Sequence, residues 1–197
     1  MKLKYIETTF ENNVKKTTEF ESKFTEDTGI ENKVINIYPN MKFQTWEGFG
    51  GAFTDAAGYV YSLMSEEDRQ KMVESYYKKE NMNYTLGRIH VDSCDFSVEQ
   101  YEAMSDEKDT EMKNFTIERT KKYMLPLLED VQKVTGREIE MMIAPWSPPV
   151  FMKTNGERSH GGKLKPEYRQ MWAEYLCKYI CELRKAGCNV VRMTIQN

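Results

Sequence analysis

The sequence predicts an α/β fold in which parallel strands alternate with helices. From residue 46 onward, short apolar runs with strand character alternate with longer segments whose apolar residues recur at helical spacing. Strand and helix in regular succession are typical of parallel βαβ units. Before residue 46, polar segments predict short strands instead. We therefore expect N-terminal strands of a side β module over residues 1–45 and an α/β domain over residues 46–197.

Composition excludes several classes of protein. The 197 residues are 40% hydrophobic and 12% aromatic, which indicates a folded core rather than disorder. The net charge of −3 offers no basic surface, so we expect no nucleic-acid partner. No apolar run approaches the roughly 18 residues that a membrane span needs, and the N-terminus lacks the apolar segment of a signal peptide. These features predict a cytoplasmic protein without a membrane span.

Short strands are expected in the N-terminal part. Segments near Tyr5–Phe10 and Thr18–Phe24 have loose strand character. Two further strands are predicted over Lys33–Tyr38 and Met41–Trp46, on either side of a turn at Pro39-Asn40.

Four strands and the helices between them are predicted in the second part. The strands are Phe49–Phe53, Tyr84–Val91, Ile139–Ala144 and Asn189–Ile195. Four helices are predicted. The first starts at Asp55, the second runs from a capping box at Ser65 to Lys79, and the other two span Ile117–Val134 and Glu167–Lys185. This succession fits a doubly wound sheet or the first half of a (β/α)8 TIM barrel. In both folds the ligand site lies beyond the carboxyl ends of the strands.

Polar and aromatic residues follow those strand ends. Asp55 comes after the first strand, Asp92 to Asp95 after the second, Trp146 after the third and Asn197 after the fourth. A carboxylate, an indole ring and an amide on one rim suit a carbohydrate, because polar groups bind hydroxyls and a flat ring supports the apolar face of a sugar. Asp55 also fits the N-cap of the following helix.

Other kinds of site find less support. The glycines from Gly48 to Gly51 do not complete a phosphate-binding pattern, since Phe53 stands in the run and no lysine follows. His90, Asp92 and Cys94 alternate, but no second cluster completes a metal sphere, so we expect neither a metal nor a cofactor. The cysteines, including the Cys177 and Cys181 pair, are expected to be free thiols.

Four motifs, in order, resemble glycoside hydrolase family 30, the glucosylceramidase family. They are EGFGGAFTDAA at 47–57, NYTLGR at 83–88 with SCDFS at 93–97, APWSPPVFMKTNG at 144–156, and TIQN at 194–197. The resemblance covers roughly residues 33–197 and points to an N-terminal part of such a protein. It favours the barrel over the doubly wound sheet and implies a side β module.

The resemblance also implies an activity, which is retaining hydrolysis of β-glucosides or glucosylceramide-like substrates. Carried over by motif, Asp55 binds sugar hydroxyls, Trp146 lines the sugar subsite and Asn197 bonds the 2-hydroxyl in the transition state. Arg88 supports the nucleophile by keeping it ionised. The family's acid/base directly follows the position of Asn197, and its nucleophile lies on a later strand. We therefore expect a truncated chain that lacks both catalytic glutamates, is inactive alone, and needs the C-terminal half of the barrel as its partner.

Three alternatives stay open from the sequence. The enzyme could be a β-xylosidase or a β-1,6-glucanase of the same family. The chain could instead be a carbohydrate-binding α/β module with no chemistry. An unrelated doubly wound nucleotide binder is the third.

Overall fold

The computed structural model describes residues 2–26, 28–29 and 35–197 as two compact units, Met1–Thr45 and Trp46–Asn197. The first unit contains the hairpin of β1 (Lys2–Glu11) and β2 (Val14–Lys23), which pair antiparallel. Its turn consists of Asn12 and Asn13, both with positive φ, which suits the tight turns that match strand twist. The strands predicted near Tyr5–Phe10 and Thr18–Phe24 therefore lie in this hairpin.

The strands predicted over 35–46 are wrong, because the described residues there form no strand. Residues 33 and 34 of the first of them lie outside the described residues. The side chains of Ile35, Ile37 and Phe43 are at least 80% exposed. Strand propensity mostly reflects packing on a half-buried sheet surface, so apolar alternation alone does not form a strand.

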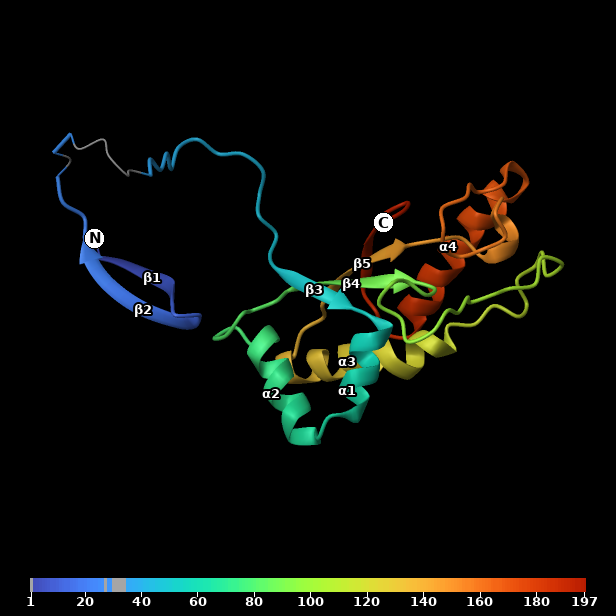
Figure 1. The fold of residues 1–197 in the computed structure, drawn as a ribbon, viewed down its shortest axis with the longest axis horizontal. Coiled ribbons are helices and arrows are strands. Elements are labelled where there is room, and N and C mark those ends of the chain that lie inside the picture. The colour runs from blue at the N-terminus through green and yellow to red at the C-terminus, as the bar shows by residue number, and fades with distance from the viewer. Residues whose placement is uncertain (1, 27, 30–34) are drawn as a thin grey trace. The chain divides into compact units, whose positions relative to one another are not determined.

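The second unit is built on a four-stranded parallel sheet in the order β3-β4-β5-β6 (Figure 1). Its strands are β3 (Gly50–Phe53), β4 (Leu86–Val91), β5 (Glu140–Pro145) and β6 (Val190–Met193). Every predicted strand of the α/β part is present within a few residues. Consecutive strands are neighbours in the sheet, which distinguishes the first half of a barrel from a doubly wound sheet.

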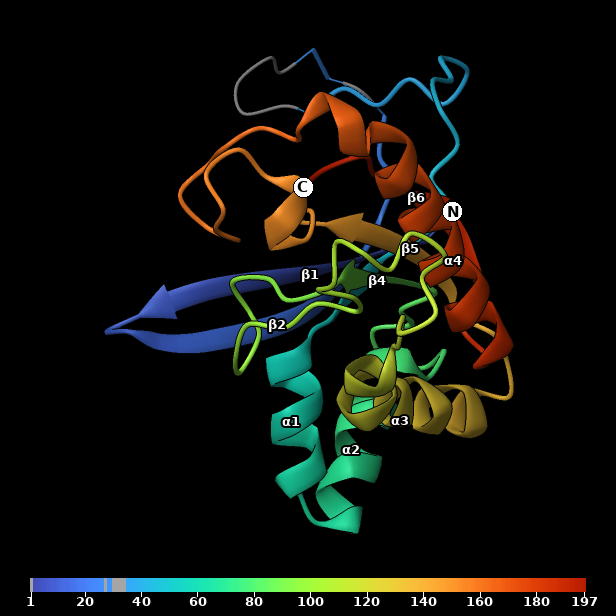
Figure 2. The ribbon, with the colours of Figure 1, turned by 90° about the vertical axis from the view of Figure 1, so that its right-hand side faces the viewer.

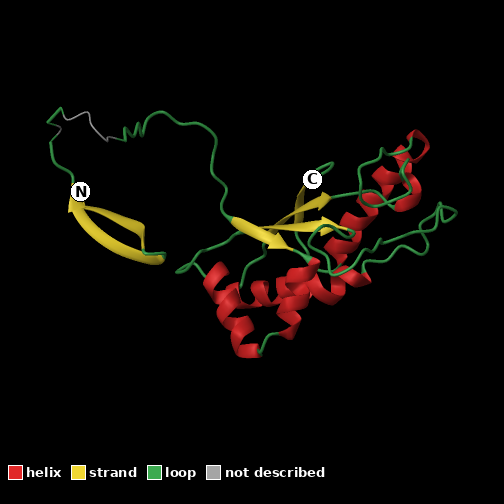
Figure 3. Ribbon diagram, viewed as in Figure 1, coloured by secondary structure: helices red, strands yellow, loops and turns green. Residues whose placement is uncertain are grey.

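Helices connect the strands, as Figure 3 shows by colour. They are α1 (Asp55–Leu63), α2 (Glu66–Tyr77), α3 (Glu118–Thr135) and α4 (Arg169–Lys185), with 3₁₀ turns at Val150–Met152 and Pro166–Tyr168. Ser65 caps α2 as predicted, accepting from the Asp68 N–H at 3.2 Å. Figure 1 and Figure 2 both show α1, α2 and α3 packed together on one side of the sheet. No described helix is long and apolar enough to cross a membrane.

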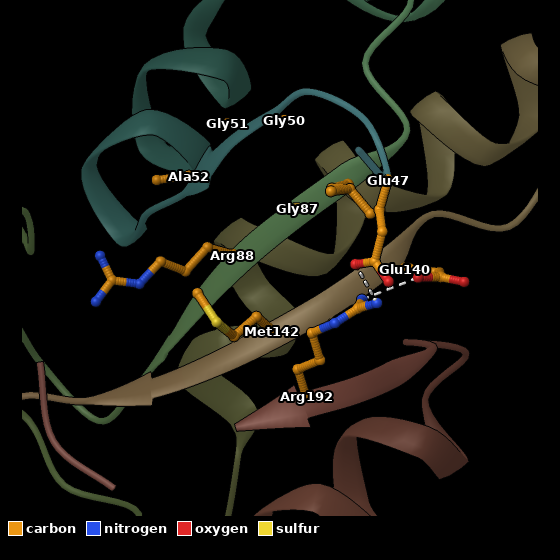
Figure 4. Close-up of a pocket in the computed structure, with 10 residues that line it drawn as sticks. Glu47, Gly50, Gly51, Ala52, Gly87, Arg88, Glu140, Met142 and Arg192 are labelled. Atoms are coloured by element: carbon orange, nitrogen blue, oxygen red, sulfur yellow. Dashed lines mark hydrogen bonds and ion pairs between the residues drawn. The ribbon is translucent and has the colours of Figure 1, made fainter. Parts of the chain in front are cut away.

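Alternate strand residues face opposite sides of the sheet. One side packs on the helices and forms the core, with fully buried Ile89, Met141, Ile143, Tyr175 and Tyr179 among its largest side chains. The other side borders a cavity of about 390 Å³ (Figure 4). There Arg192 bridges Glu47 at 2.7 Å and Glu140 at 2.9 Å, near the amino ends of the strands. This pocket extends along the sheet from the amino ends of the strands as far as Arg88, whose guanidinium points to the predicted ligand rim.

Two adjacent glycines of β3 give a sharp test of the packing. A Cβ on Gly50 would lie 2.1 Å from the Leu86 carbonyl oxygen, whereas one on Gly51 would meet only the Tyr84 ring at 3.5 Å. We expect Gly50→Ala to lower the free energy of unfolding by about 1–3 kcal/mol, since the clash is with backbone. The matched Gly51→Ala should change it by less than about 0.5 kcal/mol. Urea unfolding of the two variants measures this, and equal effects would contradict the strand pairing described.

Candidate functional site

The predicted rim exists: Asp55, Asp92, Trp146 and Asn197 all lie at the carboxyl ends of the strands. Three of the proposed site residues meet there. The Arg88 guanidinium lies over the Trp146 ring, 4.6 Å from its centroid, and its Nη2 donates to Asn197 Oδ1. The Asn197 N–H in turn donates to the Pro145 carbonyl at 2.9 Å. We call these the Arg88–Trp146–Asn197 cluster.

The cluster explains how the charged Arg88 is accommodated in the apolar strand β4. Arg88 sits with its stem on the sheet and its charge against an indole face and an amide oxygen, rather than against a carboxylate. Among the described residues its Nε has no hydrogen-bond partner. Asn197 is exposed and Trp146 is half-buried, so the cluster presents an aromatic ring and an amide at the surface of the rim. Such a surface can take up a polar ligand with one flat apolar face.

The amino end of α1 is fully occupied by protein groups. Thr54, rather than Asp55, is the N-cap, because its Oγ1 accepts from the Ala57 N–H at 3.1 Å. The Asp55 N–H donates to His90 Nε2 and the Ala56 N–H to the Phe96 carbonyl, each at 2.9 Å. The Gly58 N–H makes the first intrahelical bond, to Thr54. A phosphate needs free N–H groups at such an end, so the nucleotide alternative has no site here.

The Asp55 carboxylate is enclosed and engaged. Its side chain is 0% exposed, and it accepts from Arg119 Nε at 2.8 Å and Nη2 at 3.1 Å and from the Val98 N–H at 2.9 Å. Burial alone would raise the pKa of Asp55, but the Arg119 and Val98 hydrogen bonds outweigh it and hold the pKa below its usual value. Residues 96–99 cover this carboxylate. Its contact with a sugar stays a prediction that requires this covering segment to move.

His90 connects Asp55 to the cluster. Its Nε2 accepts from the Asp55 N–H, so its Nδ1 carries the proton and donates to the Asp92 carbonyl. Burial lowers the pKa of His90, which agrees with this neutral form. Its ring meets that of Trp146 edge-on, with centroids 6.3 Å apart. Both ring nitrogens are therefore used by the protein. No group of three metal-ligating side chains occurs in the described part of the chain.

Asp92 anchors the long loop that follows β4. It is fully buried, and it accepts from the Tyr175 hydroxyl at 2.7 Å and from the Ala103 N–H at 2.9 Å. Arg158 Nη1 lies 3.7 Å from Asp92 and 3.6 Å from Glu102. Burial raises the pKa of Asp92 to about 6, against the opposing effect of Arg158 and the two donors.

A cavity of about 490 Å³ lies beside Trp146, between the ends of β5 and β6. Its lining includes Trp172, Leu164 and Gln196 as well as the buried cations Lys153 and Arg158.

The sequence alone does not single out Arg119 or Arg158 as residues of the rim. Each is a surface-type residue in a polar or helical segment, and its partner lies more than 50 positions away, so no local pattern marks it.

A parallel half-barrel with polar and aromatic groups at its strand ends defines a TIM-barrel protein with a ligand site at the carboxyl rim. The family model described as the glycosyl hydrolase family 30 TIM-barrel domain matches residues 46–197. The chain therefore belongs to glycoside hydrolase family 30, as its motifs indicated.

Named relatives agree. The chain is 31% identical over 169 residues to the lysosomal acid glucosylceramidase of Mus musculus, which covers 83% of the chain and 33% of the relative. It is 26% identical to an endo-1,6-beta-D-glucanase of Neurospora crassa, covering 83% and 35%. The crystal structure of SrfJ from Salmonella typhimurium matches with a TM-score of 0.90 at 31% identity, over 100% of this chain and 44% of that one. The chain thus spans about a third of the length of these curated relatives.

The buried Asp92 predicts an unusual pH dependence. A carboxylate whose pKa is raised on folding contributes stability below its unfolded pKa, and that contribution is lost as the pH rises through the folded value. From the pKa of about 6, the wild type should lose up to about 3 kcal/mol relative to Asp92→Asn between pH 4 and pH 7. Urea unfolding of both proteins across this range tests it.

The matched control for that comparison is Asp95→Asn, which changes the same functional group on an exposed side chain. Because the Asp95 side chain is exposed, this variant lacks the burial cost that Asp92 carries and should not reproduce the effect of Asp92→Asn. A flat difference for Asp92→Asn, or one that grows in favour of the wild type with pH, would contradict the burial described for Asp92.

Proposed function

We propose that this chain forms part of a retaining β-glucosidase of the glucosylceramidase type, with the Arg88–Trp146–Asn197 cluster as one wall of its sugar site. The observation that carries the proposal is the meeting of an indole ring, an amide and a guanidinium at the carboxyl rim of a family 30 barrel. In this reading Trp146 supports the sugar ring and Asn197 bonds the 2-hydroxyl, a contact that strengthens in the transition state. Arg88 orients both side chains.

Catalysis would require two further carboxylates. Retaining hydrolysis uses a nucleophile and an acid/base about 5–5.5 Å apart. At the described rim, Asp55 and Asp92 are each 0% exposed and occupied by protein donors, so neither is placed to protonate or attack a glycoside. We propose that both catalytic groups belong to further barrel units of a longer protein, and that residues 1–197 alone bind glycosides without hydrolysing them.

The proposed substrate class is based on the named relatives of the chain. They include glucosylceramidases and an endo-1,6-beta-D-glucanase, and both kinds of name specify a glucose-containing substrate. We propose a β-glucosyl residue in the site, with glucosylceramide-like aglycones first and 1,6-linked glucan second. A β-xylosidase has weaker support, since the xylanase structures are only 20% identical to this chain and show the fold alone.

Hydrolysis of an aryl β-glucoside by the whole protein that carries this chain tests the activity. We expect turnover with β-glucose as the first product, as NMR of the released anomer would show. An α-product would contradict the retaining mechanism. Absence of turnover combined with glycoside binding would favour a carbohydrate-binding module instead, and absence of both would contradict the proposal entirely.

Trp146→Ala tests the sugar-supporting ring. We expect kcat/KM for the aryl β-glucoside to fall at least about tenfold, which corresponds to roughly 1.4 kcal/mol of lost transition-state stabilisation. Trp46→Ala is the matched control, since Trp46 is exposed and contacts Phe49 away from the rim. Equal losses for both variants would contradict the role of Trp146.

A further inference from the structure

Arg119 stands out among the charged residues of the rim because it joins three separate segments. Its guanidinium pairs with Asp55 of α1 through two nitrogens, at 2.8 and 3.1 Å, and with Glu99 of the loop at 2.5 Å. It also lies over two aromatic rings, 5.4 Å from the centroid of Tyr101 and 4.8 Å from that of Tyr123. Its side chain is only 20% exposed.

The position of Arg119 in its own helix is unfavourable. It lies in the first turn of α3 (Glu118–Thr135), where the helix dipole favours a negative charge. That turn also lacks a side-chain cap. An arginine there therefore destabilises the first turn of α3. The contacts of Arg119 with α1 and with the loop offset this unfavourable interaction.

Asp55 depends on Arg119 in turn. A carboxylate with 0% exposure is costly to bury unless it is paired, and Arg119 supplies its only charged donor among the described residues. The other donor is the Val98 N–H. Segment 96–99 is held over Asp55 from both sides, because the Phe96 carbonyl accepts from the Ala56 N–H and Glu99 pairs with Arg119.

A continuous set of contacts then leads from Arg119 to the sugar-facing ring. The Asp55 backbone N–H donates to His90 Nε2 at 2.9 Å, and the His90 ring meets the Trp146 ring edge-on. The Trp146 ring packs under Arg88, which bonds Asn197. A shift of Asp55 would thus reach the cluster through a single histidine.

We propose that Arg119 is a positioning residue of the sugar site, which fixes the Asp55 carboxylate and, through Asp55 and His90, the ring of Trp146. This inference rests on the proposed glycosidase function. Arg119 itself touches no substrate in it. Its bidentate grip sets where α1, the covering segment 96–99 and the indole lie relative to one another.

The test compares Arg119→Met and Arg119→Lys in the whole protein. With Met we expect KM for an aryl β-glucoside to rise about tenfold or more, the Asp55 carboxyl to titrate at a higher pH by carbon-detected NMR, and the Trp146 indole N–H resonance to shift. Lys keeps the positive charge but cannot form the two parallel hydrogen bonds of the guanidinium. Arg119→Lys should therefore bring the Asp55 titration part of the way back to the wild-type value, and should bring KM back to a smaller extent. If Met prevents folding, the Lys variant carries the comparison.

Arg69→Met is the matched control. Arg69 also lies over a tyrosine ring, 5.0 Å from the centroid of Tyr61, and donates to the carbonyls of Tyr61 and Ser62. These contacts lie within α1, and among the described residues none connects Arg69 to the rim. Both variants lose stabilising contacts, so we expect a lower melting temperature in each. In Arg69→Met, KM, the Asp55 titration and the Trp146 indole resonance should stay as in the wild type.

Two outcomes would overturn the positioning role: an Asp55 titration and an indole resonance in Arg119→Met that match the wild type, or the same changes in Arg69→Met. These readouts do not need turnover. If the wild type neither binds nor hydrolyses glycosides, the proposed function fails and with it the link to a sugar, while the spectra still decide whether Arg119 fixes Asp55 and Trp146.

Discussion

Parallel pairing of four consecutive strands is the constraint on which the rest of this structure depends. It brings the carboxyl ends of β3, β4, β5 and β6 to one rim, where the carboxylates of Asp55 and Asp92 are buried and therefore need partners. Three arginines contact the groups of this rim. Arg119 pairs with Asp55, Arg158 lies beside Asp92, and Arg88 joins Trp146 and Asn197. Each of these rim groups is thus paired with an arginine, and the Arg88–Trp146–Asn197 cluster presents a ring and an amide at the surface.

Local patterns in the sequence predict most of the α/β architecture. Short apolar runs and helical spacing predict every strand and α-helix described in the second unit, because burial on one face dictates those patterns. The residues after each strand are also predictable, since parallel strands share one functional end. That is why Trp146 and Asn197 could be assigned to one rim although 51 positions separate them, as their numbers show. The choice of the barrel over the doubly wound sheet rests on the motif resemblance, the strand order of the sheet and the family match.

Pairing between distant residues was beyond such reasoning. The strand pattern at 41–46 has no partner strand among the described residues, and nothing local reveals this. Thr54 and Asp55 are both good capping residues, and only the Ala57 N–H bond shows that Thr54 takes the cap. The burial of Asp55 follows from Arg119, 64 positions later in the chain. Asp55, which the resemblance assigns to binding sugar hydroxyls, is covered by segment 96–99 in this structure, and that contact stays a prediction.

Family membership and the rim geometry together support a glycoside site with Trp146 as its floor, while the catalytic pair is proposed to come from further barrel units. The most direct measurement is a crystal structure of the whole protein with a β-glucoside or a non-hydrolysable analogue bound. We expect a sugar ring stacked on the face of Trp146 opposite Arg88, with its 2-hydroxyl within hydrogen-bond distance of Asn197. A sugar bound elsewhere, with Trp146 and Asn197 uncontacted, would contradict it.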